Sequence, residues 1–365
     1  MDIKVITRHA ISNYGSLLQS IATIKILEQL GYKCEIINYI RDDEYGLNAV
    51  KTALNNKPYW RSSFLKRLAY IVIRYPEEKL AEIKFDVMRR RYLKMTQLFK
   101  TQNELKQLDA DIFMTGSDQV WGPLLNGYYD STYFLSFVNK KKKIAYAASF
   151  GRTEFTPEIL AEYKGLLSSY TGITVRENTA IDLLNQMDIK CLGQVLDPTL
   201  LLTGEKWSNL ITKEKLGKYV LVYQVHNDPM LNEYAVKFAK HVKLPLYRLS
   251  LLLHQINRGG RFIYLPDLSR FLSYIKNCTY LVTDSFHGTA FALNFNRQFI
   301  GILPNNKSGT RIQSILQLTG LTDRIVTNYN DFSISDSIIN YQSVNRILER
   351  ERYQSIEILK GLVGY

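Results

Sequence analysis

The sequence has little cysteine and little histidine, which limits the disulfide and metal chemistry open to it. Its three cysteines, Cys34, Cys191 and Cys278, lie far apart, and each is in or next to an apolar run. Such an odd, dispersed set predicts buried, reduced thiols and a cytoplasmic protein rather than a disulfide framework. No two cysteines have the spacing of a zinc site and the five histidines are scattered, so we expect no structural metal.

Long apolar runs are absent too. No run reaches the roughly 18 apolar residues that a membrane-spanning helix requires. Residues 1–7 lack the apolar core of a signal peptide and predict a first strand instead. The apolar share of 46% excludes a disordered chain. The length of 365 residues predicts two domains, because single cores rarely exceed about 250 to 300 residues.

Acidic residues are outnumbered, and the net charge of +13 predicts an acidic partner. Nucleic acid, anionic lipid and a phosphorylated small substrate are the three candidates. The chain carries no helix-turn-helix, zinc-finger or RNA-binding signature, so we expect no nucleic-acid partner. The dense basic run 140–143 stands just before an apolar strand and predicts a solvated loop.

Residues 41–100 are helical in character, with basic and aromatic residues interleaved. Within them, residues 61–74 combine bulky apolar side chains with four positive charges. This helix could lie in a membrane interface with its cations on lipid phosphates. Alternatively, it is an amphipathic helix that packs on its own domain. A second helix is expected over about 77–98.

The rest of the chain alternates between strands and helices. A strand at 3–7, a helix at 16–30 and a strand at 34–39 predict a β-α-β unit. A second alternation of this kind follows Asp197 and Pro198. We therefore predict an α/β protein with two Rossmann-like domains that face each other across a cleft. The predicted parts are a first domain at 1–172 with a helical insert at 41–100, a second domain at 173–335, and a final helix at 336–365 that packs back on the first domain.

A polar turn, Asp284 to Gly288, follows the apolar strand 280–283. If a helix begins near Gly288, its first N–H groups and its dipole make a seat for a carboxylate or a phosphate. His287 would lie at that seat and could pass a proton near pH 7. Ser285 adds a hydroxyl there, and Gly288 lets the backbone come close. Alternatively, Asp284 or Ser285 merely caps the helix.

Two further polar turns follow strands. After the strand 111–115, Asp118 could accept a proton or hold a sugar hydroxyl, and Trp121 offers a flat face for a sugar ring. Alternatively, Asp118 caps a short helix and Trp121 is core. After the strand 172–175, the planar fork of Arg176 suits a carboxylate or a phosphate. Alternatively, Arg176 pairs with Glu177 on the surface.

Taken together, six short motifs resemble those of bacterial polysaccharide pyruvyl transferases in order and spacing. The resemblance runs from about residue 3 to about residue 325. The motifs are Asn13-Tyr14-Gly15 followed by Leu18-Gln19, Gly116-Ser117-Asp118-Gln119-Val120-Trp121, Tyr146-Ala147-Ala148-Ser149-Phe150-Gly151, Val175-Arg176-Glu177, Leu196-Asp197-Pro198-Thr199 and Asp284-Ser285-Phe286-His287-Gly288-Thr289.

The resemblance implies a fold like that of the GT-B glycosyltransferases and a donor that is phosphoenolpyruvate. The implied product is a pyruvate ketal that bridges two hydroxyls of one hexose in a lipid-linked or polymeric glycan, as in exopolysaccharide or capsule biosynthesis. It also implies that no cofactor is bound, and that the enzyme is cytoplasmic, with a possible peripheral site on the inner face of the membrane.

The resemblance also carries site residues. Relatives have an Arg-Leu-His triplet where this chain has Ser285-Phe286-His287, so His287 matches and Ser285 replaces the arginine. We expect His287 to contact the phosphate and to act as the acid, with Gly288 beside it in the donor site. The missing charge would come from Arg176, Lys307 or Arg311. Asp118 is the candidate base on the acceptor side. The residues expected to hold the sugar are Asn13, Tyr14, Gln119 and Trp121.

Two other functions stay open at this point. One is a GT-B glycosyltransferase that uses a nucleotide sugar, which would need a pocket for a base and a ribose in the second domain. The other is a binding protein for anionic glycan or lipid that has lost catalysis. The observation behind this possibility is Ser285, which replaces the arginine of relatives.

Overall fold

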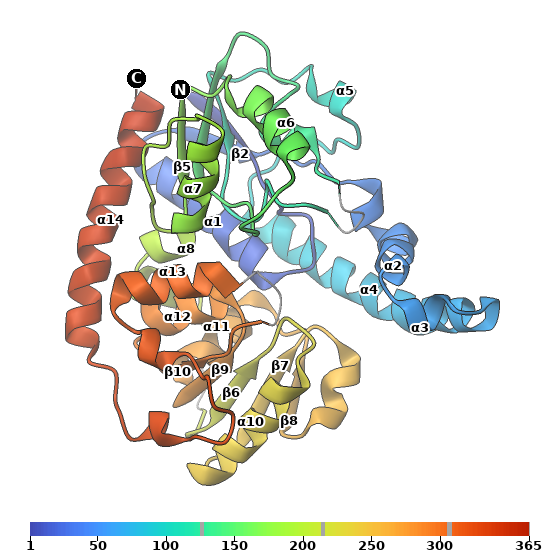
Figure 1. Ribbon diagram of the computed structural model, residues 1–365, viewed down its shortest axis with the longest axis vertical. Helices are drawn as coiled ribbons and strands as arrows, with labels where there is room; N and C mark the ends of the chain where they lie inside the picture. Colours follow the sequence, from blue (N-terminus) through green and yellow to red (C-terminus); the bar gives the residue numbers. More distant parts are fainter. Residues whose placement is uncertain (125–127, 213–215, 305–308, 365) are drawn as a thin grey trace. The chain divides into compact units, whose positions relative to one another are not determined.

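The computed structural model describes residues 1–124, 128–212, 216–304 and 309–364, which form two compact units (Figure 1). Unit 1 comprises Met1–Pro198 and Ile356–Tyr365, and unit 2 comprises Thr199–Ser355. Each unit is built around its own five-stranded parallel sheet. This confirms the prediction of two parallel α/β domains.

The sheet of unit 1 has the strand order β2-β1-β3-β4-β5. All of its strands run parallel, so their carboxyl ends lie along one edge. Ligands of open α/β sheets bind at that edge. The strands are β1 (Asp2–Ile6), β2 (Lys33–Ile36), β3 (Ile112–Thr115), β4 (Lys142–Ala148) and β5 (Gly172–Val175).

Helix α1 (Tyr14–Gln29) connects β1 to β2 and is buried over most of its circumference. This explains why apolar residues occur on nearly every side of it in the sequence. Asn13 caps the helix, because its side-chain oxygen accepts hydrogen bonds from the N–H groups of Gly15 and Ser16. The cap holds the start of α1 at the carboxyl end of β1.

The insert between β2 and β3 consists of η1 (Asp42–Glu44), α2 (Gly46–Asn55), α3 (Pro58–Arg61) and α4 (Phe64–Tyr92). Helix α3 and the first turns of α4 lie away from the sheet of unit 1 (Figure 1). The two helices expected at 61–74 and 77–98 are in fact one, because α4 continues through Pro76. A proline inside a helix costs about 3 kcal/mol. Buried contacts on both sides of Pro76, at Tyr70 and Phe85, offset this cost.

The sheet of unit 2 has the strand order β10-β9-β6-β7-β8, again all parallel. Its strands are β6 (Val220–Tyr223), β7 (Leu246–Ser250), β8 (Arg261–Tyr264), β9 (Tyr280–Thr283) and β10 (Gln298–Gly301). The helices between and after them are α10 (Pro229–His241), α11 (Leu268–Asn277), α12 (Phe286–Asn294) and α13 (Thr310–Thr319).

Shorter elements complete the two units. They are α5 (Gln102–Leu105), η2 (Ser131–Phe134), α6 (Pro157–Leu167), α7 (Asn178–Gln186), α8 (Pro198–Leu201), α9 (Gly204–Ser208), η3 (Leu253–Arg258), η5 (Thr322–Arg324) and η6 (Ser333–Ser335). The last helix, α14 (Tyr341–Gly364), belongs to unit 2 up to Ser355 and to unit 1 from Ile356. Across the described ranges, no helix combines the length and the apolar character that crossing a membrane would require.

The boundary between the units differs from the predicted one at 172/173. Strand β5 pairs with β4 as the edge strand of the first sheet. Leu183 and Leu184 of α7 share a hydrophobic core with Ile173 of β5. Unit 1 therefore continues to Pro198. Residues 173–198, which the sequence predicts in the second domain, belong to the first.

Candidate active site

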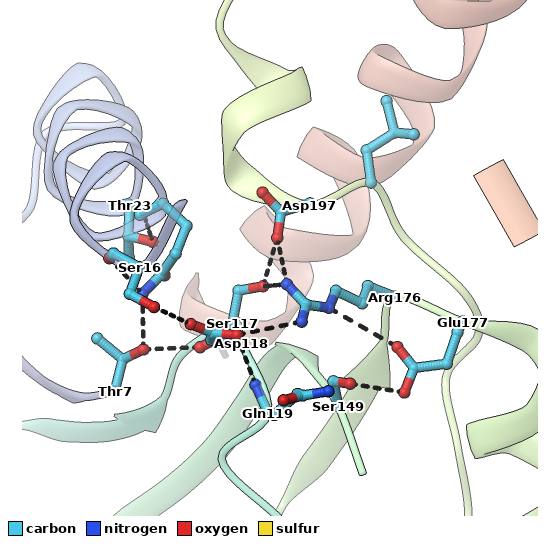
Figure 2. A network of polar contacts seen from close by, with 12 residues as sticks. Thr7, Ser16, Thr23, Ser117, Asp118, Gln119, Ser149, Arg176, Glu177 and Asp197 are labelled. Atoms are coloured by element: carbon cyan, nitrogen blue, oxygen red, sulfur yellow. Dashed lines mark hydrogen bonds and ion pairs between the residues drawn. The ribbon is translucent and has the colours of Figure 1, made fainter. Parts of the chain in front are cut away.

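Polar side chains at the carboxyl ends of β1, β3, β4 and β5 meet in one hydrogen-bonded network in unit 1 (Figure 2). They come from segments far apart in the sequence, and the shared edge of the parallel sheet brings them together. The members are Thr7, Ser16, Ser117, Asp118, Gln119, Ser149, Arg176, Glu177 and Asp197.

Asp118 lies just after β3 with a backbone φ of 86°. A non-glycine residue in this region costs of order 1–3 kcal/mol and is held only where its surroundings fix it. Here, the Ser16 hydroxyl donates to one carboxylate oxygen of Asp118, and the Gln119 N–H donates to the other at 2.8 Å. The side chain of Asp118 is 10% exposed, so this carboxylate is held in place but is not sealed off from solvent.

Arg176 follows β5, and its side chain is completely buried. Its Nη1 donates to Asp197 at 2.9 Å and to Ser117 at 3.3 Å, and its Nη2 donates to Asp118 at 3.3 Å. Its Nε lies 3.7 Å from a carboxylate oxygen of Glu177. Burial lowers the pKa of the Arg176 guanidinium, but the three carboxylates outweigh burial and raise it, so the side chain is a cation.

The network carries more negative than positive charge. One guanidinium faces the carboxylates of Asp118, Glu177 and Asp197, and the side chains of the latter two are at most 2% exposed. A sugar hydroxyl could donate a hydrogen bond to the Asp118 carboxylate here.

The prediction that Arg176 offers its fork to an anion is therefore not met within unit 1, because the fork is occupied by internal carboxylates. The alternative, a surface pair of Arg176 and Glu177, is met only in part. The two residues are neighbours, but both side chains are buried.

Trp121 and Tyr14 differ from the prediction that they hold a sugar. The Trp121 side chain is 0% exposed and stacks on Phe134 with the ring centroids 5.7 Å apart. Tyr14 is also 0% exposed, and its ring packs on Phe85 of α4 at 5.0 Å. Both rings are part of the core of unit 1, because a large apolar side chain is most stable where it is removed from water.

Gln119 and Asn13 are both half-buried, and Asn13 accepts a hydrogen bond from the N–H of Ser16, a member of the network. Gly151 makes room for Gln119, since a Cβ at this glycine would be 2.6 Å from the Gln119 amide nitrogen. Gly151 also has a φ of +65°, which favours glycine. The side chain of Gln119 therefore lies over the Gly151 turn, while its backbone N–H donates to Asp118.

The turn in unit 2, Asp284 to Gly288, lies at the carboxyl end of β9. Helix α12 begins at Phe286, earlier than the expected start near Gly288, so His287 is in the first helical turn. The Ser285 hydroxyl caps the helix by accepting a hydrogen bond from the Gly288 N–H at 3.2 Å. Ser285 therefore caps the helix, as the alternative interpretation predicts. The same geometry places His287 at the positive end of the helix dipole.

Asp284 fixes this turn to the loop after β6. Its carboxylate accepts hydrogen bonds from the N–H groups of Val225 and His226 at 2.7 and 2.8 Å. The His226 Nδ1 lies 3.2 Å from the same carboxylate. His287 is 6% exposed, and its ring lies against Phe286. The imidazole is therefore held in place by its surroundings. A side chain that contacts one particular ligand atom needs to be fixed in this way.

Arg311 and Lys307 are the two remaining candidate cations of the donor site. Arg311 is half-buried in the first turn of α13. Lys307 lies outside the described residues.

Sequence reasoning did not assign a role to Ser117, Ser149 or Asp197 in the site. The available signal was that Ser117 and Ser149 each stand in a motif after a strand, where a parallel sheet gathers side chains.

Comparison with known families assigns the chain. The family model described as polysaccharide pyruvyl transferase matches residues 13–306, which include the network of unit 1 apart from Thr7 and the Asp284–Gly288 turn of unit 2. The chain belongs to the polysaccharide pyruvyl transferase family. A comparison with curated proteins found no match. The family membership confirms the resemblance inferred from the six motifs, five of which contribute residues to the edge of the first sheet.

Solved structures similar to this pyruvyl transferase family member show its fold. A protein described as a UDP-N-acetylglucosamine 2-epimerase from Listeria monocytogenes is 11% identical with a TM-score of 0.52, over 95% of this chain and 90% of that chain. The S. aureus protein MnaA with UDP is 12% identical with a TM-score of 0.50, over 98% and 90%. The E. coli heptosyltransferase WaaC with ADP is 10% identical with a TM-score of 0.42, over 96% and 100%. The first two of these structures, with TM-scores of 0.52 and 0.50, support the two-domain, GT-B-like fold.

Proposed function

We propose that this protein transfers the pyruvyl group of phosphoenolpyruvate to two hydroxyls of one hexose, with release of phosphate. The acceptor is a hexose of a lipid-linked or polymeric glycan in exopolysaccharide or capsule biosynthesis, and the reaction takes place in the cytoplasm without a bound cofactor. The observation that carries the proposal is the convergence of the family's motifs on the Asp118–Arg176 network, where a net negative, partly accessible carboxylate suits a hydroxyl-bearing acceptor.

The donor suits the turn of unit 2. Phosphoenolpyruvate carries a phosphate and a carboxylate, so its site needs cationic or helix-end contacts. In this proposal, the first turn of α12 and His287 contact the phosphate, and Arg311 supplies charge in place of the arginine that Ser285 replaces. Ser285 and Gly288 shape the turn. Lys307 remains a further candidate for the charge.

The reaction begins with a proton that His287 delivers to the methylene carbon of phosphoenolpyruvate. The neighbouring carbon then becomes electron-poor, and a sugar hydroxyl attacks it and loses its proton to Asp118. Phosphate leaves with the electron pair of its C–O bond, and the second hydroxyl closes the ketal and releases its proton. Gln119 and Asn13 hold the sugar, while Arg176 acts through Asp118 by fixing its position and stabilising its charge.

Phosphate release from phosphoenolpyruvate by purified protein, with and without hexose acceptors, tests the reaction class. We expect acceptor-dependent release, and we expect His287→Ala to lower it by about a hundredfold, as loss of a general acid does. If His287→Ala stayed within about threefold of the wild type, less than 1 kcal/mol in the barrier, the role of His287 would be wrong.

The same assay separates the two alternatives. A glycosyltransferase would be stabilised against heating by a nucleoside diphosphate and not by phosphoenolpyruvate. A binding protein without catalysis would bind glycan and release no phosphate with any acceptor. Either result would contradict the proposal.

A further inference from the structure

Helix α4 of unit 1 carries apolar side chains on two opposite faces. The inner face packs into the unit through Tyr70, Ala81, Phe85 and Met88, which are at most 8% exposed. The outer face of a surface helix is normally polar. Here, it presents seven exposed apolar residues: Leu65 (76%), Leu68 (48%), Val72 (63%), Tyr75 (37%), Leu80 (41%), Ile83 (51%) and Val87 (62%).

These seven residues share one face of α4, which we call the α4 stripe, and Lys79, Asp86 and Arg90 lie on the same face. The spacings of the seven apolar residues are three, four, three, five, three and four residues, so at 100° per residue they fall within about 140° of the helix circumference. The stripe extends from Leu65 to Val87, so at 1.5 Å per residue it runs for about 33 Å. Phe64 and Ile73 border it at 75% and 58% exposure, and Tyr59 of α3 adds a ring at 66%. Single exposed apolar residues need no explanation, but a row of them on one face marks an interaction site.

The segment that contains the first half of the α4 stripe carries charges of one sign. Residues 45–76 contain no acidic residue, whereas they contain Lys51, Lys57, Arg61, Lys66, Arg67 and Arg74. Lys84, Arg90 and Arg91 are exposed further along α4. A surface that is apolar along its centre and cationic along its edges complements a partner that is apolar inside and anionic at its surface.

The acidic residues of α4 do not cancel this charge at the stripe. Glu77 pairs with Arg74 and Asp86 pairs with Arg89. Glu82 is 2% exposed and accepts a hydrogen bond from the Gly46 N–H. Glu78 is half-buried, and burial raises the pKa of its carboxyl group. Because Glu77 also neutralises Arg74, the cations that lie beside the stripe on α4 are Lys66, Lys84, Arg90 and Arg91.

We propose that the α4 stripe lies in the interface of an anionic lipid membrane, with its apolar side chains at the acyl boundary and its flanking cations on lipid phosphates. The helix would lie along the membrane plane. A second copy of the chain suits the stripe less well, because self-pairing would bring two rows of positive charge together. This membrane contact is independent of the proposed pyruvyl transfer.

Vesicle flotation tests the proposal, with phosphatidylglycerol mixed into phosphatidylcholine or with phosphatidylcholine alone. We expect the wild type to float with the anionic vesicles at low salt and to be released as salt is raised. The double substitution Leu68→Glu with Val72→Glu should lower the bound fraction at least about tenfold. Ile338→Glu in unit 2 replaces an apolar residue that is 78% exposed, and it should leave binding unchanged.

Tryptophan fluorescence gives a second readout of the same contact. Trp60 of α3 is half-buried and stacks near Tyr70, whereas Trp121 and Trp207 are 0% exposed. On anionic vesicles, the emission should shift to the blue and brominated lipids should quench it, and both effects should report Trp60. In the double variant the effects should disappear, while its circular dichroism stays that of the wild type.

Three outcomes would overturn the proposal. The first is wild-type protein that stays at the bottom of the gradient at low salt. The second is flotation that the double variant leaves unchanged. The third is a wild-type dimer in sedimentation analysis that the double substitution converts to a monomer, with no vesicle binding by either protein, which would assign the stripe to a second copy.

Discussion

At the scale of single residues, the first site depends on how Arg176 is used. Its side chain is 0% exposed and lies among three carboxylates, of which Asp118 is the most accessible. An arginine in this position does not meet a ligand itself. It holds a carboxylate in one place and one charge state, so Arg176 is a positioning residue and Asp118 is the group that reaches the acceptor.

Asp118→Asn should remove the base and leave the site's shape. We expect turnover to fall at least about a hundredfold, the usual range for loss of a general base, while the KM for phosphoenolpyruvate changes little. Phosphate release measures both parameters. Asp109→Asn is the matched control, because the Asp109 side chain is 82% exposed. A D118N variant that kept a tenth of the turnover would contradict the role.

Arg176→Met should leave three carboxylates buried around an apolar side chain. We expect the free energy of unfolding near pH 7.5 to fall by about 3–5 kcal/mol. Without the cation, the pKa values of these carboxyls in the folded state rise above their unfolded values of about 4. Stability of the variant is then lost as pH rises, so its deficit relative to the wild type should be smaller at pH 5 than at pH 7.5.

Urea unfolding at the two pH values measures that deficit. Arg350→Met is the control, because the Arg350 side chain is 63% exposed and its pair with Glu351 contributes little. A deficit that stays constant, or that grows toward pH 5, would show that Arg176 does not stabilise these carboxylates.

At the scale of elements, the site in unit 2 consists of strand β9, the Asp284–Gly288 turn and helix α12, which hold one another in place by hydrogen bonds and close packing. The Thr283 hydroxyl donates to the carbonyl oxygen of Tyr223 at 2.7 Å and accepts a hydrogen bond from the Ser285 N–H at 3.1 Å. The Gly288 backbone lies directly over this hydroxyl. The start of α12 is therefore set against β9 at van der Waals distance, which fixes where His287 lies.

Gly288→Ala should break this packing. Its Cβ would be 2.5 Å from the Thr283 hydroxyl oxygen, so either the strand or the helix must move. We expect a loss of about 1–3 kcal/mol in the free energy of unfolding, together with loss of the thermal shift that phosphoenolpyruvate produces in the wild type.

Gly165→Ala in α6 is the matched control for that substitution. No atom lies within 4 Å of the Cβ that it would add, and alanine is favoured over glycine in a helix, so we expect a gain of about 0.5–1 kcal/mol. An unchanged thermal shift in Gly288→Ala would show that the close contact does not shape the donor site.

Many elements could be predicted from the sequence, and the exceptions have physical reasons. The parallel strands have apolar runs that end in polar turns, which predicts both the strands and the edge where side chains gather. Helix α4 could not be predicted as one helix, because a proline at its centre indicates a break that packing overrides. The burial of Trp121 could not be predicted either, since an aromatic side chain after a strand suits a sugar or a core equally.

At the scale of the whole molecule, α14 passes from one unit to the other. Its last residues from Ile356 belong to unit 1, and Leu362 is 4% exposed there. Leu362 lies so close to β5 that a Cβ at Gly172 would be 2.5 Å from it. The last turns of the chain therefore complete the core beside the strand that carries Arg176.

Leu362→Ala should destabilise unit 1 by about 2–5 kcal/mol, the cost of removing a buried leucine side chain. Tryptophan fluorescence resolves the units, because Trp121 lies in unit 1 and Trp207 in unit 2. In single-tryptophan variants, the unfolding midpoint reported by Trp121 should fall more than the one reported by Trp207. Ile338→Ala, at a residue that is 78% exposed, should move neither. Equal shifts at both tryptophans would contradict the assignment of the last turns to unit 1.

If a pyruvyl group is transferred, the carbon of phosphoenolpyruvate must become part of the acceptor. Phosphoenolpyruvate labelled with 13C in its carbon skeleton would be incubated with the protein and a panel of hexose acceptors, and the acceptor would be analysed by mass spectrometry. The account predicts that the label becomes covalently attached to one hexose as a ketal, in step with phosphate release. Label that stays in phosphoenolpyruvate or appears only as free pyruvate, with every acceptor, would contradict it.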